Sequence, residues 1–201
     1  MRKLFLSLAA LALIASPALA GKYNKVISVG QKAPDFSGIP AVIGDKDASI
    51  SLGDTKEDVV VLVFLANHCP VVTQYEDRII DFANDYKGKP VKVVAVAVDA
   101  NNEIDKLPGI KQRVKDKSYP FVYGYQENQE IGKAYGATNT PQFFVLDKNR
   151  VIRYTGAMDD NTNESKVTKQ YLRDAVDALL AGNSPPVDET RAVGCGIPYK
   201  R

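Results

Sequence analysis

The sequence predicts an α/β fold with a central mixed β-sheet flanked by helices and a β-hairpin added at the amino-terminal side. Three observations support this prediction. An unbroken apolar run fills positions 59–66, and a second run, apolar except for Lys92, fills positions 91–98. A segment of helical period separates the two runs. Further along, two short apolar stretches around a turn precede an amphipathic segment that ends near Leu180. Because strands buried on both faces need cover on each side, we expect helices on both faces of the sheet.

The amino-terminal part of this fold is predicted to be a hairpin at the edge of the sheet. Residues 30–52 contain several glycines and two short alternating stretches, at 41–43 and 48–52. Alternation of apolar and polar residues is typical of a strand with one buried face. These stretches therefore favour an edge hairpin over a helix.

The centre of the fold is predicted to be a strand, helix, strand unit. Residues 59–66 are β-branched or apolar throughout, as expected of a strand buried on both faces. Pro70 suits the first turn of a helix, and apolar residues then recur at helical spacing up to Tyr86. A second buried strand at 91–98 completes a unit of the right length for a parallel pair.

The second half of the chain adds more helices and a hairpin. The predicted elements are helices near 109–117 and 129–135, a strand at 121–123, hairpin strands at 142–146 and 151–154, and a last helix over 163–180. The last helix carries apolar residues on one face, which predicts that this face packs against the sheet.

Residues 1–20 have the features of a cleaved signal peptide. A short basic start precedes an apolar run of about 11 residues, and the small-residue pattern Ala18-x-Ala20 stands before Gly21. A transmembrane helix needs roughly 20 apolar residues, so this run is too short for a membrane anchor. We expect a mature protein that begins near Gly21, is periplasmic or secreted, and has no membrane span.

The mature chain is expected to form one domain over 21–182 and a tail over 183–201. With 45% hydrophobic and 25% charged residues, the composition is that of an ordinary globular domain. The tail is rich in Gly and Pro and has neither a helical nor a strand period, so its composition predicts a loose end. It nevertheless contains Cys195, flanked by two glycines.

Composition and charge exclude several classes of function. Once Arg2 and Lys3 leave with the leader, the basic residues only balance the 24 acidic ones, so no general attraction to nucleic acid or anionic membranes is expected. The single histidine, His68, excludes zinc sites with two or three His ligands, and two cysteines are too few for a four-thiolate site. The sequence also lacks a glycine-rich phosphate loop. We therefore expect no metal and no cofactor.

Cys69 is the strongest candidate for chemistry. It stands where the strand at 59–66 ends and the helix opening with Pro70 begins. The free N–H groups and the positive dipole end of a helix favour the thiolate and so lower the pKa of a cysteine placed there. His68 beside it adds a cation below about neutral pH. The alternative is a buried structural cysteine, but the position of Cys69 at a helix start favours a redox-reactive one.

The order of elements and several short motifs resemble the thioredoxin superfamily. Residues 64–72 are similar to its active-site stretch, with Cys69 in the place of the nucleophilic cysteine. Thr140-Pro141 resembles the family's cis-proline, which packs against that cysteine and offers backbone hydrogen bonds to a substrate chain. Asn-His-Cys-Pro, Tyr-Glu-Asp-Arg and a late Gly-Cys-Gly-Ile are similar to its exported, peroxiredoxin-like branch (AhpC/TSA or redoxin-type). The likeness covers roughly residues 29–197.

The resemblance implies a thioredoxin-like fold and an enzyme that exchanges thiols and disulfides. Its partners would be a protein or small-molecule thiol or disulfide and an external electron donor that the sequence does not identify. In this interpretation Cys69 attacks as a thiolate, and substrate contacts come from His68, Pro70, Thr140 and Pro141.

The sequence also departs from the family patterns. Val72 stands where thioredoxins have their second cysteine, so the motif holds no local dithiol. Leu62 and Ala66 stand where a peroxiredoxin has Pro and Thr, and its activating Arg aligns near Pro141. Peroxide reduction by the usual peroxiredoxin residues is therefore poorly supported, and a thiol peroxidase with a different activation is kept as an alternative.

Three interpretations are open for Cys195, the only other cysteine. If the tail folds back, Cys195 resolves Cys69 through a reversible disulfide that closes a loop of about 126 residues. The second interpretation is a permanent disulfide that fixes the tail, as is natural in an exported protein. The chain is then a non-enzymatic binding module with a groove beside Pro141. The third is a pair of free thiols.

A copper site is a weaker candidate. His68, Cys69 and Cys195, together with Met158, offer the soft ligands that suit Cu(I). No spacing rule supports such a site.

Glu76 is a weaker candidate for proton transfer. It lies two helical turns after Cys69 on the same face. The alternative is that Glu76, Asp77 and Arg78 are surface and ion-pair residues, and this second interpretation is the favoured one.

Overall fold

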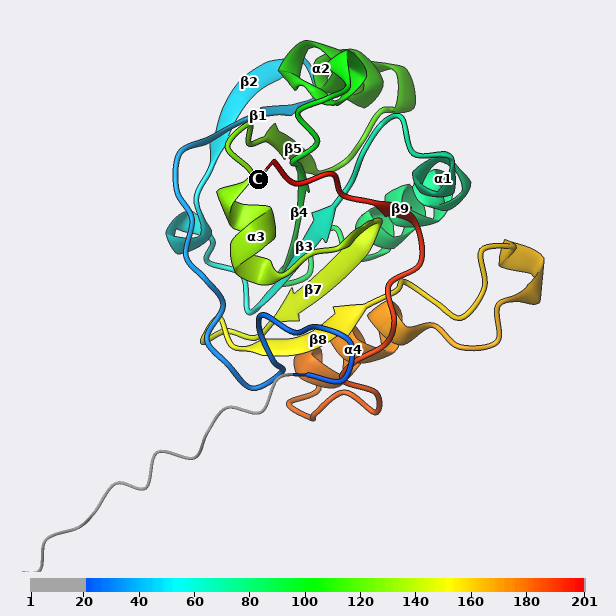
Figure 1. Cartoon of the computed structure of the whole chain (residues 1–201). Helices are drawn as coiled ribbons and strands as arrows, with labels where there is room; N and C mark the ends of the chain where they lie inside the picture. The colour runs from blue at the N-terminus through cyan, green and yellow to red at the C-terminus, as the bar shows by residue number, and fades with distance from the viewer. Residues whose placement is uncertain (1–20, 201) are drawn as a thin grey trace, which may run out of the picture.

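The computed structural model describes residues 21–200, and the predicted signal peptide lies outside this range. A seven-stranded mixed sheet forms the centre of the described part (Figure 1). The order across the sheet is β2-β1-β5-β4-β3-β7-β8. These strands are β1 (Ile39–Ile43), β2 (Lys46–Ile50), β3 (Val59–Phe64), β4 (Val91–Ala97), β5 (Val122–Tyr125), β7 (Gln142–Leu146) and β8 (Ile152–Gly156).

The middle of the sheet is parallel and its two sides are antiparallel. β3 pairs with β4, and β4 with β5, in parallel register. β7 and β8 continue the sheet antiparallel on one side, and the β1–β2 hairpin closes the other side. Parallel neighbours need crossover connections, which α1 (Pro70–Asp85) and α2 (Leu107–Lys117) supply. The predicted mixed sheet with an edge hairpin is confirmed.

Helices cover both faces of the sheet, and β3 is therefore buried on both of its faces. Its odd-numbered residues share a core with α1, α2 and α4 (Tyr171–Leu180), and its even-numbered residues share one with α3 (Glu130–Tyr135). Successive side chains of a strand point to opposite faces, so one apolar run builds two cores. Each buried aliphatic side chain contributes roughly 1.5–3 kcal/mol to stability. Within the described range, no helix is long and apolar enough to cross a membrane.

The last helix is shorter than predicted. The sequence indicated a helix over 163–180, whereas α4 begins at Tyr171. The Asp160 carboxylate holds the preceding segment by accepting the backbone N–H groups of Thr168 and Lys169 at 2.9 and 3.1 Å. Such bonds from a side chain to the backbone compete with the helical ladder, so the helix starts later than the apolar spacing predicted.

The prediction that the tail is a loose end is wrong. Its strand β9 (Cys195–Gly196) pairs antiparallel with β6 (Asn139–Thr140). Upstream of β9, the Glu189 carboxylate accepts three backbone N–H groups from residues 22–24 at 2.7 to 2.8 Å. Figure 1 shows the tail running from α4 back across the body of the molecule. Long-range contacts therefore order a segment whose composition alone indicates disorder.

Candidate active site

Cys69 lies where helix α1 begins, just beyond the carboxyl end of β3. Its N–H donates to the carbonyl of Ala66 at 3.1 Å and closes the turn between strand and helix. Cys69 occupies the N-cap position of α1 without a capping hydrogen bond from its side chain, and its carbonyl accepts the Thr73 N–H at 3.1 Å. The first turn of α1 contains Pro70 and no acidic residue, so no carboxylate in that turn offsets the positive end of the helix.

A disulfide joins Cys69 to Cys195. The two Cα atoms are 5.9 Å apart, and 126 positions separate the residues in the sequence. The Cys69 side chain is completely buried, whereas Cys195 is half-buried. The interpretation with two free thiols is therefore wrong for this structure, and the other two, a reversible and a permanent disulfide, both require the bond that is seen.

The Thr140-Pro141 segment lies directly against this disulfide. Its peptide bond is cis, as the family resemblance implied. The carbonyl oxygen of Thr140 is 3.2 Å from the Sγ of Cys69, and Thr140 is the partner of Cys195 in the β6–β9 pair. The fold thus brings together four of the predicted site residues. A fifth, Pro70, is exposed at the start of α1.

His68 is held between two buried carboxylates. Its Nδ1 contacts the Asp105 carboxylate, and its Nε2 lies 3.7 Å from Oδ2 of Asp99. Asp105 also accepts the backbone N–H groups of Asn67 and His68. Burial raises the pKa of Asp105, and the hydrogen bonds from His68 offset only part of this rise. The carboxylates therefore fix the turn that immediately precedes Cys69.

These three side chains also form a group in the described range that could share a metal ion. One ligand atom each from His68, Asp99 and Asp105 lies within 4.8 Å of the others. Both carboxylates already accept N–H groups of the protein, so we interpret the group as a support for the imidazole. The copper ligand set is not assembled, because both cysteines are in the disulfide and Met158 lines a separate pocket.

Glu76 and Arg78 are buried, and the prediction that they lie on the surface is wrong. The carboxylate of Glu76 accepts hydrogen bonds from Arg113 at 2.6 Å and Tyr119 at 2.5 Å, and pairs with Lys117 at 3.0 Å. Burial raises the pKa of Glu76, but these hydrogen bonds outweigh burial, and the net shift is downward. The predicted ion pairing is confirmed. The cations come from α2, which the sequence alone could not place beside α1.

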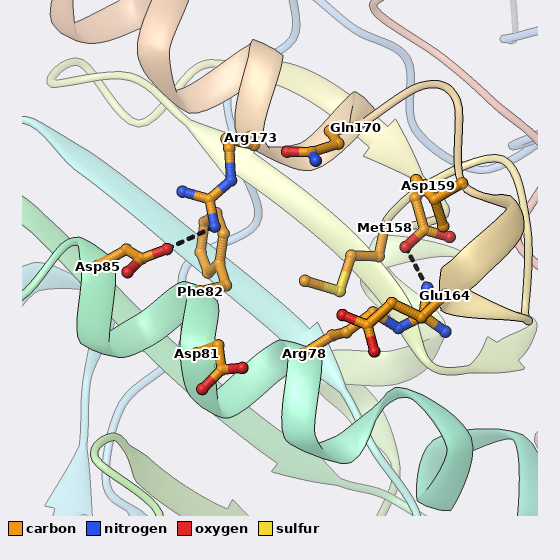
Figure 2. Close-up of a pocket in the computed structure, with 10 residues that line it drawn as sticks. Arg78, Asp81, Phe82, Asp85, Met158, Asp159, Glu164, Gln170 and Arg173 are labelled. Carbon is orange, nitrogen blue, oxygen red and sulfur yellow. Dashed lines mark hydrogen bonds and ion pairs between the residues drawn. The ribbon is translucent and has the colours of Figure 1, made fainter.

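Arg78 lines a pocket between α1 and the segment that leads into α4 (Figure 2). Its guanidinium donates to Asp159 at 2.5 Å, while across the pocket Arg173 pairs with Asp85 at 2.7 Å. Met158 points between these pairs. Because the Arg173–Asp85 pair joins α4 to α1, and the Arg78–Asp159 pair joins α1 to the segment before α4, we interpret this pocket as a structural junction between α1 and α4.

Three residues of the site, Asp99, Asp105 and Gln129, were not predicted from the sequence. Asp99 directly follows the predicted strand at 91–98. A polar residue at the carboxyl end of a parallel strand is typical of a functional site, so this position was a signal that could have identified Asp99. Asp105 and Gln129 carried no such signal. Both are completely buried, and both act on partners distant in the sequence, Gln129 through hydrogen bonds to the tail.

The fold and the site together define a thioredoxin-like protein. The sheet is mixed, and a cysteine occupies the N-cap position of the helix after the central strand. The carbonyl oxygen of Thr140, which belongs to the cis Thr140-Pro141 bond, lies 3.2 Å from the sulfur of this cysteine. A family model described as Redoxin matches residues 28–172, and the chain belongs to this family.

Comparison with individual proteins agrees with this assignment. The thiol-disulfide oxidoreductase ResA of Oceanobacillus iheyensis is 26% identical over 130 residues, which cover 64% of this chain and 65%, slightly under two thirds, of that protein. An uncharacterised conserved protein of Geobacillus kaustophilus has a similar structure, with a TM-score of 0.78 and 34% identity over 88% of this chain and 95% of that one. A hypothetical protein of Sinorhizobium meliloti gives a TM-score of 0.79 and 31% identity over 88% and 97%.

Proposed function

We propose that this chain is an exported thiol-disulfide oxidoreductase, with Cys69 as the nucleophile and Cys195 as the resolving cysteine. One observation carries the proposal: a cysteine that caps a helix is bonded to a cysteine on the tail, beside a cis-proline. Membership of the redoxin family and the likeness to a protein named as a thiol-disulfide oxidoreductase support the same chemistry.

The two sulfurs differ in a way that orders the reduction step. Cys195 is half-buried and Cys69 is completely buried, so an incoming thiolate reaches Cys195 more readily. Cys69 is also the better leaving group, because the start of α1 stabilises its thiolate. The incoming sulfur bonds to Cys195 as the protein disulfide breaks. A second thiol then attacks this mixed disulfide, so two external thiols become one external disulfide and the protein gains two thiols.

The reduced protein acts through Cys69. Its thiolate attacks a substrate disulfide, one substrate sulfur bonds to Cys69, and the other leaves and takes up a proton. Cys195 then attacks the sulfur of Cys69, which restores the protein disulfide and releases the second substrate thiol. Every step is reversible, so the potentials of the substrate and of the external donor set the direction. We propose His68, Pro70, Thr140 and Pro141 as the residues that contact the substrate.

Exchange with insulin or a small model disulfide tests this mechanism. Cys69→Ser is expected to abolish exchange because no nucleophile remains. Cys195→Ser is expected to accumulate a mixed disulfide on Cys69, which mass spectrometry detects as the added mass of the substrate. Full activity of Cys69→Ser would refute the proposal.

Export is the second part of the proposal. The basic start, the short apolar run and Ala18-x-Ala20 support removal of residues 1–20 and a periplasmic or secreted protein. Thiols are oxidised in these compartments unless a donor keeps them reduced, which fits a reversible disulfide. The amino terminus of protein expressed in a bacterial host should be Gly21. Recovery of the uncleaved chain in the cytoplasm would contradict this part.

A further inference from the structure

The tail strand, which we define as residues 194–200, lies on the protein as an extended peptide. From Cys195 onward, half-buried and exposed residues alternate: Cys195, Ile197 and Tyr199 are half-buried, and the residues between them are exposed. This period of two is that of a strand with one face on a surface. The tail strand therefore shows how an extended chain binds beside the disulfide.

Backbone groups of the tail strand are bound along its length. Thr140 pairs with Cys195, and the N–H of Ile197 donates to the carbonyl of Thr138 at 2.9 Å. Beyond β9, the buried amide of Gln129 donates to the carbonyl of Pro198 at 3.1 Å and accepts the N–H of residue 200 at 2.7 Å. Gln129 thus binds the peptide groups on both sides of residue 199. A small thiol has no backbone to make these contacts, whereas an extended polypeptide does.

Two positions of the tail strand are restricted by contact with the body. A Cβ at Gly194 would collide with the carbonyl oxygen of Thr140 and lie 3.1 Å from the nitrogen of Pro141, so only glycine fits directly before the cysteine. Four residues after Cys195, the hydroxyl of Tyr199 donates to the carbonyl of Ala137 at 2.7 Å.

The body of the protein also packs closely around the ring of Tyr199. A Cβ at Gly132 would lie 3.1 to 3.2 Å from ring carbons of Tyr199, so the absence of a side chain at Gly132 makes room for the ring. Ile197 packs against the core that α3 shares with the sheet. The surface beside β6 therefore accommodates a glycine one position before the bonded cysteine, an isoleucine two positions after it and a tyrosine four positions after it.

We propose that this surface is the docking site for substrate proteins, and that the tail strand occupies it until the disulfide is reduced. This proposal rests on the thiol exchange proposed above. The substrate is then an extended, cysteine-containing segment with Gly before the cysteine, an aliphatic residue two positions after it and Tyr four positions after it. A tethered tail has an effective concentration in the millimolar range, so a substrate in trans competes with it. Reduction removes the covalent bond that makes the tail the permanent occupant.

Synthetic peptides test this specificity without altering the fold. The peptide has the sequence of residues 192–200, and its cysteine is linked to glutathione as a mixed disulfide. The full-length Cys195→Ser variant, reduced beforehand, supplies Cys69. The Cys69 thiolate attacks the peptide sulfur, the bond to glutathione breaks, and glutathione leaves as a thiol. Mass spectrometry then measures the rate at which the peptide adds to the protein.

Peptides with single changes, numbered as in the chain, provide the comparison. Gly194→Ala and Tyr199→Ala are each expected to react about tenfold more slowly, because one introduces a collision and the other loses a buried ring and its hydrogen bond. Lys200→Ala is the control, since the Lys200 side chain is exposed and the groups of Lys200 that bind the body are its backbone N–H and carbonyl. Its rate should equal that of the parent peptide. Glutathione disulfide serves as a reference substrate that reacts with Cys69 but lacks the extended peptide segment that would occupy the docking site.

The outcomes separate the docking site from the chemistry. Equal rates for all peptides would overturn the docking proposal and leave the exchange chemistry intact. No reaction with any disulfide would overturn the proposed function itself. Competition by the tail is tested by adding Tyr199→Ala to the protein, which should raise the rate of the parent peptide relative to glutathione disulfide about tenfold. Val193→Ala, an exposed tail position, should leave that ratio unchanged.

Discussion

Replacing Cys195 with serine removes the covalent bond that ties the tail to helix α1. The bond spans 126 positions, and for a loop of this size the chain-entropy estimate of its stabilising effect is about 5 kcal/mol. We treat this value as an upper limit, because any strain in the native bond reduces it. Cys195 is half-buried, so the serine hydroxyl keeps access to water and adds little cost of its own.

The core should survive this change. Among the described residues, every buried apolar side chain lies before the tail, the last being Val176. The Cys195→Ser variant should therefore unfold in one cooperative transition in urea, with a free energy of unfolding lowered by at most about 5 kcal/mol. Val193→Ala, a control on the same segment, should change it by less than about 0.5 kcal/mol. A loss well above 5 kcal/mol, or disappearance of the cooperative transition, would refute the reasoning, because it would mean that the disulfide holds the core together.

Two buried carboxylates give further predictions with opposite pH dependence. Glu76→Gln should lower the free energy of unfolding near neutral pH by about 2 kcal/mol, because its cations lose a buried anion, whereas Asp77→Asn, at an exposed neighbour, should have little effect. Because the fold lowers the pKa of Glu76, its contribution is lost as the pH falls through that pKa, and the variant and the parent should converge in urea titrations in acid. Equal stability near neutral pH would contradict this account. Asp105 has a raised pKa, so the fold is penalised as the pH rises through it. The stability of Asp105→Asn relative to the parent should therefore increase from acid to neutral pH, and a flat or falling difference would contradict the assignment.

The central unit of the fold was predictable because local patterns determine it. The run at 59–66 is apolar at every position, which requires burial on both faces, and Pro70 marks the start of the next helix. These two features also place Cys69 at a helix start, so the nucleophile follows from the same pattern. The identification of Thr140-Pro141 depended on the family resemblance instead.

The tail and the surroundings of His68 were not predictable, because distant contacts determine them. Nothing local indicates that Cys195 pairs with Thr140, or that Gln129 binds the segment after it. Likewise, the two carboxylates beside His68 belong to the segment after β4, about thirty to forty positions further along the chain, and the topology alone brings them there. The composition of the tail predicted a loose end because composition contains no information about these distant partners.

The most direct test of the account is a redox titration of the purified mature protein in a dithiothreitol series. Free thiols are counted by mass after alkylation at each potential. We predict that the Cys69–Cys195 disulfide opens near biological potentials while the protein stays folded, and that Cys69 then alkylates quickly below neutral pH. A disulfide that resists reduction until the protein unfolds would contradict it and would make the bond a permanent structural link.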